Sequence, residues 1–321
     1  MTSVIELPPD EVIQRGSIDR ESIERIEWYV PIWTCEVGGE RVVIAAKGGR
    51  NFLLSDASLQ WEAALLDGLE GAGFPSSRTA RIFDGSDHTF VDGRHYVART
   101  WVPGRMLAEF DNPDLFAVGR FVAEYHAAAS TIALPQRDGF TPLEDVLLSV
   151  DDAGMRRVLG DEQLVHKFRA CVDAVVPSIA GVGTSMPVHG DFTTRNIAAN
   201  DPSTFTGLID FGMAHAACPA VELAYAVGSA RPTYDHVEYD LDRVTTFVRG
   251  YCSIGTLDAD DPARIVGFAE ARPLLGLAFY AFANQPPPDD RRTEGSFGRT
   301  RWIADHRDEL IAAIEAGIRG R

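Results

Sequence analysis

Residues 186–225 constrain the fold more than any other segment of this chain. Short apolar runs alternate there with polar residues that neither a strand nor a helix requires. The runs 197–199 and 207–209 flank the turn-forming sequence Asn-Asp-Pro at 200–202, so they predict a β-hairpin. A hairpin fixes the positions of the polar residues at its open end. These residues are the first candidates for catalysis and metal binding.

The register of the hairpin decides which polar side chains meet. If Ala199 faces Gly207, Asn196 lies opposite Asp210 at the open end of the ribbon, just beyond Asp191. Mg²⁺ prefers oxygen ligands in octahedral geometry and usually shares them with substrate phosphates. We therefore expect Asn196 and Asp210 to be metal ligands that leave positions for phosphate oxygens and water. Asp191 would then be the base for an attacking hydroxyl.

The order of these residues resembles the protein-kinase-like phosphotransferases. His189-Gly190-Asp191 is followed by Asn196 and then by the sequence Ile-Asp-Phe-Gly at 209–212. This arrangement is most similar to the aminoglycoside phosphotransferase family, where H-G-D-x-x-x-x-N precedes I-D-F-G or I-D-W. The ordered combination is specific, whereas Asp-Phe-Gly alone is not.

The resemblance implies a function and a role for each matching residue. It implies an ATP- and Mg²⁺-dependent kinase, with GTP as the other nucleotide, that phosphorylates a hydroxyl of a small molecule. Asp191 and Asn196 would be catalytic, Asn196 and Asp210 would bind the metal, and His189 would brace the two loops. Glu222 occupies the position at which the family often has an aspartate that packs behind the catalytic loop.

The composition limits the partners of the chain. It has 321 residues, 30 basic and 47 acidic side chains, and a formal net charge of −17. This charge repels nucleic acid. It is consistent with a cationic small molecule as the partner, and equally with an acidic surface that is simply solvated. The four cysteines form no close pair, which disfavours zinc sites and disulfides. Without a signal peptide or a membrane-spanning run, we expect a cytoplasmic protein with no membrane partner.

A strand hairpin and a helix are predicted in the N-terminal part. The stretches 27–37 and 41–47 are rich in β-branched and aromatic residues and are separated by two glycines. Ser55 or Asp56 would cap the next helix and Gly71 would end it.

Glu62 lies within the apolar stripe of this helix, where a carboxylate is costly unless it is paired. Lys47, at the end of the preceding strand, is the natural cation. In kinase-like folds such a lysine, held by a helix glutamate, binds the nucleotide phosphates. The resemblance therefore extends to Lys47 and Glu62, while a solvated lysine, or an alignment that puts Ala45 in its place, remains the alternative.

The expected nucleotide hinge follows two further strands. Stretches 79–83 and 95–102 are predicted as strands, with 87–94 as their turn, and Pro103-Gly104 would end the second. The resemblance places the adenine against the backbone of Thr100, Trp101 and Val102. The alternative is an ordinary strand end. No glycine-rich loop precedes residue 27, so a phosphate-binding loop is not evident from the sequence.

The rest of the chain is predicted to be helical. The apolar periodicity indicates helices near 115–129, 164–175, 219–225, 237–251, 265–282 and 299–318, with a kink at Pro273 and a loop at 285–295. Strands first and helices afterwards predict an α+β fold of two lobes. The small antiparallel-sheet lobe would bind nucleotide (1–102), and the larger helical lobe would carry catalysis and substrate binding (103–321).

Two other functions use the same residues. A metal hydrolase would take His189, Asp191, Asp210 and His215 as ligands, but it leaves Asn196 without a role. A pseudoenzyme scaffold is disfavoured because Asp191, Asn196 and Asp210 are all present.

The acceptor of a kinase is less determined by the sequence. The acidity favours a cationic, aminoglycoside-type acceptor, with homoserine- or choline-type metabolites as the alternative. Acidic residues of the later helices would contact it: Asp235, Glu238, Asp240, Asp242 and Glu270.

Overall fold

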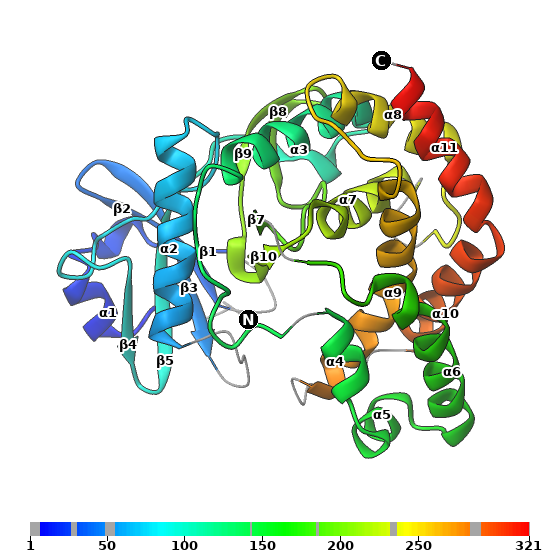
Figure 1. Ribbon diagram of the computed structural model, residues 1–321. Coiled ribbons are helices and arrows are strands. Elements are labelled where there is room, and N and C mark those ends of the chain that lie inside the picture. Colours follow the sequence, from blue (N-terminus) through cyan, green and yellow to red (C-terminus); the bar gives the residue numbers. More distant parts are fainter. Residues whose placement is uncertain are drawn as a thin grey trace.

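The computed structural model describes residues 7–26, 31–48, 55–141, 143–183, 186–231, 236–282 and 290–320. Figure 1 shows a sheet with α1 and α2 on one side of the molecule and a larger, mainly helical part on the other. This is the two-lobe α+β fold that the sequence predicts. The elements of the smaller lobe are α1 (Asp10–Arg15), η1 (Arg20–Ser22), β1 (Glu24–Ile26), β2 (Ile32–Val37), β3 (Glu40–Gly48), α2 (Asp56–Gly71), β4 (His88–Val91) and β5 (Arg94–Thr100).

The smaller lobe is built on a five-stranded antiparallel sheet with the order β1-β2-β3-β5-β4. The predicted β2–β3 hairpin is confirmed: its turn consists of Gly38 and Gly39, both at positive φ, which glycine adopts without strain. Alternate residues of β3, Val42, Ile44 and Ala46, are buried on one face. The part of the predicted first strand at 27–30 lies outside the described residues.

The prediction for residues 79–94 is wrong. β4 spans His88–Val91, inside the expected turn, and Thr79 makes only an isolated bridge to Arg99. The turn between β4 and β5 is Asp92-Gly93, with φ of 50° and 76°. An Asp-Gly pair at positive φ matches the twist of a two-residue hairpin, so this local preference sets the strand position.

Helix α2 joins the sheet to the larger lobe. It begins where expected, because the Ser55 hydroxyl accepts the amide N–H of Ser58 at 3.1 Å, and it ends at Gly71. Leu66 and Leu69 of its apolar face belong to the core of the larger lobe. The face that carries Glu62 therefore packs on the core of the larger lobe.

The larger lobe contains two small sheets and the remaining helices. Its strands are β6 (Arg105–Met106), β7 (Met186–Val188), β8 (Ile197–Asp201), β9 (Thr204–Leu208) and β10 (His215–Ala217), paired as β6-β8-β9 and β10-β7. Its helices are η2 (Leu107–Glu109), α3 (Leu115–Ala129), α4 (Leu143–Ser149), α5 (Asp152–Leu159), α6 (Glu162–Ile179), η3 (Phe211–Met213), α7 (Pro219–Val227), η4 (Gly228–Ala230), α8 (Leu241–Cys252), α9 (Asp261–Phe282), α10 (Asp290–Asp305) and α11 (Arg307–Arg319). No helix among the described residues has the length and apolar character to cross a membrane.

The C-terminal prediction needs two corrections. The expected helix 299–318 is two helices, α10 and α11, which are divided at His306. The expected loop 285–295 is helical from Asp290 onward, and 283–289 lie outside the described residues. Burial of Phe297, Ser296 and Thr300 on one side of α10 explains the extension, because packing outweighs the weak helix preference of this polar segment.

Candidate active site

The catalytic loop begins where β7 ends. Gly190 has a φ of +77°, and a Cβ at this position would lie 2.2 Å from the carbonyl oxygen of Met213. Only glycine permits this approach. The close contact brings the loop after β7 against the loop after β9.

His189 connects these two loops. Its Nε2 donates to the carbonyl oxygen of Ile209 at 2.8 Å, and its Nδ1 accepts the amide N–H of Asp191 at 3.2 Å. The ring is buried, and burial lowers its pKa, so the neutral tautomer required by both hydrogen bonds is favoured. The ring also packs edge-on against Phe211, with centroids 4.7 Å apart.

Asp191 is held by Asn196. The amide nitrogen of Asn196 donates to Asp191 Oδ2 at 3.0 Å and to its carbonyl oxygen at 2.8 Å. The amide oxygen of Asn196 is thereby directed away from Asp191. The Asp191 side chain is 41% exposed, and Arg272 Nη2 lies 3.5 Å from its Oδ1. Partial desolvation raises the pKa of Asp191, and Arg272 opposes that shift.

The hairpin places Asp210 differently from the predicted register. Gly207 pairs with Ala198 instead of Ala199, and the register shifts beyond that pair, as at a β-bulge. Asn196 therefore pairs with Ile209, whose amide N–H its carbonyl oxygen accepts at 2.9 Å. Asp210 follows at a φ of +63°, a conformation that turns an exposed side chain out of the ribbon.

Lys47 and Glu62 form the expected ion pair. Lys47 Nζ lies 3.5 Å from Glu62 Oε2. Nζ also lies 3.5 Å from the position of a Cβ on Gly212, and Asp210 Oδ1 lies 3.3 Å from that position. Lys47 is therefore located between the glutamate of α2 and the aspartate after β9.

Two arginines complete the surroundings of Glu62. Arg99 Nη2 lies 2.8 Å from Oε1, and Arg137 Nη2 lies 3.0 Å from Oε2. Burial alone would raise the pKa of Glu62, but Lys47, Arg99 and Arg137 together hold it well below its usual range. Glu62 is therefore a fully paired, ionised carboxylate.

Arg137 is a site residue that the sequence did not reveal. It lies between α3 and α4 and is 2% exposed. Its Nη1 donates to the carbonyl oxygens of Phe211, Gly212 and Ala214 at 3.3, 3.1 and 2.8 Å. An arginine in a connecting segment usually projects into solvent. No sequence signal therefore indicated that Arg137 contacts both Glu62 and the loop after β9.

The expected hinge has two of its amide groups engaged within the protein. The N–H of Thr100 donates to the carbonyl oxygen of Arg78 at 2.9 Å, and the N–H of Trp101 donates to the carbonyl oxygen of Arg41 at 3.0 Å. The N–H groups of Thr100 and Trp101 therefore already have acceptors within the protein.

Glu222 lies behind the catalytic loop. It is fully buried on α7, and its Oε2 accepts the backbone N–H of His189. Oε1 has no hydrogen-bond partner among the described residues. Burial raises the pKa of Glu222 to about 8, against the stabilising effect of the backbone N–H groups of the loop. This glutamate is therefore largely protonated at neutral pH.

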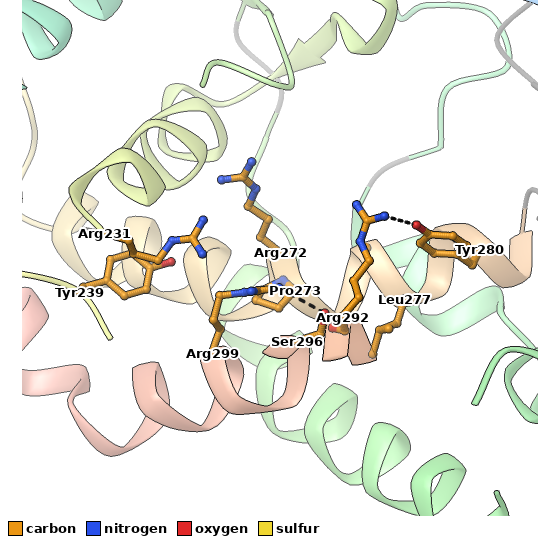
Figure 2. Close-up of a pocket in the computed structure, with 10 residues that line it drawn as sticks. Arg231, Tyr239, Arg272, Pro273, Leu277, Tyr280, Arg292, Ser296 and Arg299 are labelled. Carbon is orange, nitrogen blue, oxygen red and sulfur yellow. Dashed lines mark hydrogen bonds between the residues drawn. The ribbon is translucent and has the colours of Figure 1, made fainter. Parts of the chain in front are cut away.

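A cavity of about 120 Å³ lies between α9, α10 and the segment after η4. We call it the arginine pocket; its lining residues are Arg231, Tyr239, Arg272, Pro273, Gly276, Leu277, Tyr280, Arg292, Ser296 and Arg299 (Figure 2). Arg272, which also contacts Asp191, joins the pocket to the catalytic loop. These arginines are scattered along the chain, so no sequence pattern indicated that they line one pocket.

The geometry does not support the metal-hydrolase alternative. Both ring nitrogens of His189 are engaged in the hydrogen bonds that join the loops. His215 Nδ1 lies 2.9 Å from the carbonyl oxygen of Met213, and the ring stacks on Phe140. Within the described residues no group of three histidine, cysteine, aspartate or glutamate side chains is arranged to hold a metal ion.

The chain is similar to proteins of a known family. The family model described as "Phosphotransferase enzyme family" matches residues 47–265, which include Lys47, Asp191 and Asp210. A search of curated proteins gave no match.

Solved structures of kinases resemble the whole chain. A microcompartment-associated aminopropanol kinase has a TM-score of 0.72 at 16% identity, covering 97% of this chain and 98% of its own. An amicoumacin kinase, in complex with AMP-PNP, Ca²⁺ and Ami, has a TM-score of 0.69 at 14% identity, covering 94% of each chain. A thermostable mutant of the aminoglycoside phosphotransferase APH(4)-Ia, with ADP and hygromycin B, has a TM-score of 0.60 at 15% identity, covering 95% of this chain and 97% of its own.

The TM-scores show a shared fold, and the family model covers more than half of the sequence. The chain therefore belongs to the phosphotransferase enzyme family and has the two-lobe fold of these small-molecule kinases.

Proposed function

We propose that the protein is an ATP- and Mg²⁺-dependent kinase that phosphorylates a hydroxyl group of a small molecule. The observation that carries the proposal is the position of Asp191, an accessible carboxylate held by Asn196. His189 joins its loop to the loop of Asp210, which lies near Lys47. Family membership supports the reaction type, and the AMP-PNP and ADP bound to structural neighbours support a nucleotide donor.

Asp191 is assigned the role of base. Its raised pKa makes it a better proton acceptor than an ordinary aspartate, and its exposure admits an acceptor hydroxyl. The hydroxyl oxygen bonds to the γ-phosphorus while the bond from that phosphorus to the β,γ-bridging oxygen breaks. The hydroxyl proton passes to Asp191, and ADP leaves. His189 keeps the loop in position through its hydrogen bonds to Asp191 and Ile209.

The residues present fit a magnesium site. Asn196 directs its amide oxygen away from Asp191, and Asp210 provides an exposed carboxylate, so two hard oxygen donors are available. Mg²⁺, when bound, neutralises charge on the phosphate oxygens. We assign Asn196 and Asp210 as its protein ligands.

The nucleotide is assigned to the space between the lobes. Lys47, oriented by Glu62, lies beside Asp210 and is the cation for the phosphates. The backbone of 100–102 is assigned to the adenine, chiefly through Val102, because Thr100 and Trp101 donate their N–H groups within the protein. We place the lobe boundary at 102/103. The contacts do not select between ATP and GTP.

The expectation of a cationic, aminoglycoside-type acceptor came from the overall charge. Two of the acidic residues named for that role have structural contacts: Asp240 caps α8, and Glu270 pairs with Arg307 at 2.8 Å. Asp235 lies outside the described residues. The arginine pocket, which Arg272 joins to Asp191, is lined by four arginines and by no described carboxylate.

A nucleotide-consumption screen tests the proposed function. ATP would be incubated with panels of hydroxylated amines, hydroxy acids and sugars, and phosphorylated products detected by mass spectrometry. Transfer should require Mg²⁺, and Asp210→Ala should raise the Mg²⁺ concentration needed for half-maximal activity, with a smaller rise for Asn196→Ala. The proposal fails if ATP neither binds nor reacts, or if both variants need no more Mg²⁺ than the parent protein.

A further inference from the structure

The arginine pocket concentrates positive charge in an acidic protein. Four of its ten lining residues are arginines, and no carboxylate is among the described residues that line it. Arg272 comes from α9, Arg292 and Arg299 come from α10, and Arg231 follows η4 (Figure 2). The formal charge of the whole chain is −17, so the local sign is opposite to the global one.

Two of these guanidinium groups converge on one point. Arg272 Nη1 lies 2.7 Å, and Arg231 Nη2 lies 3.9 Å, from the position that a Cβ on Gly228 would occupy. The absence of a side chain at Gly228 is what admits Arg272 to this place. Both guanidinium groups therefore lie close to Gly228, and an anion that reaches both is attracted by both.

Hydrogen bonds and ring contacts orient the arginines. Arg231 donates to the carbonyl oxygens of Gly228 and His236 at 3.1 and 3.2 Å. The Arg292 guanidinium lies over the ring of Tyr280, 5.4 Å from its centroid, and bonds its hydroxyl. Arg299 donates to Ser296 at 3.3 Å. Because these side chains are already oriented, they lose less conformational entropy when a ligand binds.

Arg272 links the pocket to the base. It lines the cavity and lies 3.5 Å from Asp191 Oδ1. A molecule that binds Arg272 in the pocket therefore contacts the same side chain as the carboxylate to which the proposed function assigns the hydroxyl proton.

We propose that the acceptor carries an oxyanion group, a carboxylate or a phosphate, which binds in the arginine pocket while its hydroxyl reaches Asp191. This inference rests on the proposed kinase function. Guanidinium forks match the two oxygens of a carboxylate or phosphate, whereas the described lining residues offer no carboxylate to an ammonium group. The acceptor is consequently a hydroxy acid or a hydroxylated phosphate ester.

A binding experiment tests the pocket independently of the acceptor's carbon skeleton. The protein would be saturated with AMP-PNP and Mg²⁺, so that the γ-phosphate position is filled, and titrated with acetate or inorganic phosphate while its thermal stability is recorded. Glycerate and glycerol 3-phosphate then separate a carboxylate preference from a phosphate preference, and glycerol and 1-amino-2-propanol are the neutral and cationic comparisons. We expect saturable stabilisation by the anions only.

Variants localise the effect. Arg292→Gln and Arg299→Gln should each raise the dissociation constant of the stabilising anion about 10-fold or more, as expected for a lost hydrogen bond to a charged group. Arg301→Gln is the matched control, because Arg301 also lies on α10 but is 81% exposed and pairs with Asp305. Unchanged AMP-PNP binding would show that each variant is folded.

The outcomes separate the two proposals. If AMP-PNP binds and no anion stabilises the protein, or if the arginine variants bind anions as the parent does, the anionic acceptor is excluded and the kinase function stands. Preferential stabilisation by 1-amino-2-propanol has the same meaning. Failure to bind AMP-PNP in the presence of Mg²⁺ would instead contradict the proposed function.

Discussion

Two carboxylates of the candidate active site differ in their environment. Glu62, on α2, is buried and has three cations within 3.5 Å, and its pKa is lowered. Asp191, on the catalytic loop, is 41% exposed and has one arginine at 3.5 Å, and its pKa is raised. The same functional group is thus kept ionised in one place and made more ready to accept a proton in the other.

Glu222 gives a third case, in which burial acts with no cation among its contacts. Its pKa is raised to about 8 although backbone N–H groups favour its ionised form. In these three residues the direction of the pKa shift follows the number of neighbouring cations: three lower the pKa of Glu62, whereas one beside Asp191 and none beside Glu222 leave the pKa raised. We therefore expect substitutions at these positions to differ in kind: loss of activity, loss of stability, and a change in pH dependence.

The largest effect is expected on activity, at Asp191. Asp191→Asn should lower kcat by about 10²–10⁴-fold, because the amide cannot accept the hydroxyl proton. AMP-PNP binding should change little, since Asp191 is not assigned to metal or nucleotide. Steady-state kinetics and a nucleotide titration measure the two quantities. Near-parental turnover would remove the distinction between Asp191 and Glu62.

The next effect is expected on stability, at Glu62. Glu62→Gln leaves buried cations without their counter-charge and should cost about 3–5 kcal/mol of unfolding free energy. Glu70→Gln, on the same helix, is the control: its pair with Arg78 is on the surface and should contribute less than about 1 kcal/mol. Urea unfolding at pH 7 measures both.

The pH dependence of the Glu62 contribution has a defined sign. Because the folded pKa is lowered, its stabilisation is present above the unfolded pKa of about 4.3 and is lost as the pH falls toward the folded value. The difference between the parent and Glu62→Gln should therefore shrink below about pH 4. A difference that is constant from pH 7 to pH 3 would contradict the charged state assigned to Glu62.

A smaller effect is expected at Arg137, which joins Glu62 to the loop after β9. Arg137→Lys retains the charge but cannot maintain the forked bonds to Glu62 and to three carbonyl groups. We expect a loss of about 1.5–3 kcal/mol of unfolding free energy. A rise in the Mg²⁺ concentration for half-maximal activity should accompany it, because the loop carrying Asp210 loses an anchor. Stability loss with unchanged Mg²⁺ dependence would make Arg137 a packing residue only.

The smallest effect at acidic pH is expected at Glu222. Since the protonated acid and an amide are similar in shape and both accept the N–H of His189, Glu222→Gln should change stability by less than about 1 kcal/mol at pH 5. The raised folded pKa means that the parent's stability is full below the unfolded pKa and is lost as the pH rises toward about 8. The variant should gain on the parent by at most about 1.4 kcal/mol per pH unit over that range. Parallel stability curves would show that Glu222 is ionised like Glu62.

The sequence determined features that depend on neighbours along the chain. The Ser55 cap of α2, the two-glycine turn after β2 and the helix start at Asp114 follow from local preferences, and the structure confirms them. Asp191 and Asn196 are only five positions apart. The loop and hairpin predicted from the sequence therefore allow these two side chains to meet, as they do in the structure. The prediction of a turn over 87–94 was wrong for 88–91, which form β4, because the Asp92-Gly93 pair alone makes the turn.

The tertiary structure alone decided the long-range contacts. Arg137 lies 75 positions from Glu62 along the chain, and a shift in the β8–β9 pairing moves Asp210 relative to Asn196. Packing selects such partners, and it depends on the whole fold instead of on spacing.

The same holds for charge. The net value of −17 is a sum that carries no positions, and it led to the expectation of a cationic acceptor. Folding brought four arginines from separate segments to one cavity beside Asp191. The field in a pocket comes from the charges within a few ångströms, because solvent and salt screen the distant ones.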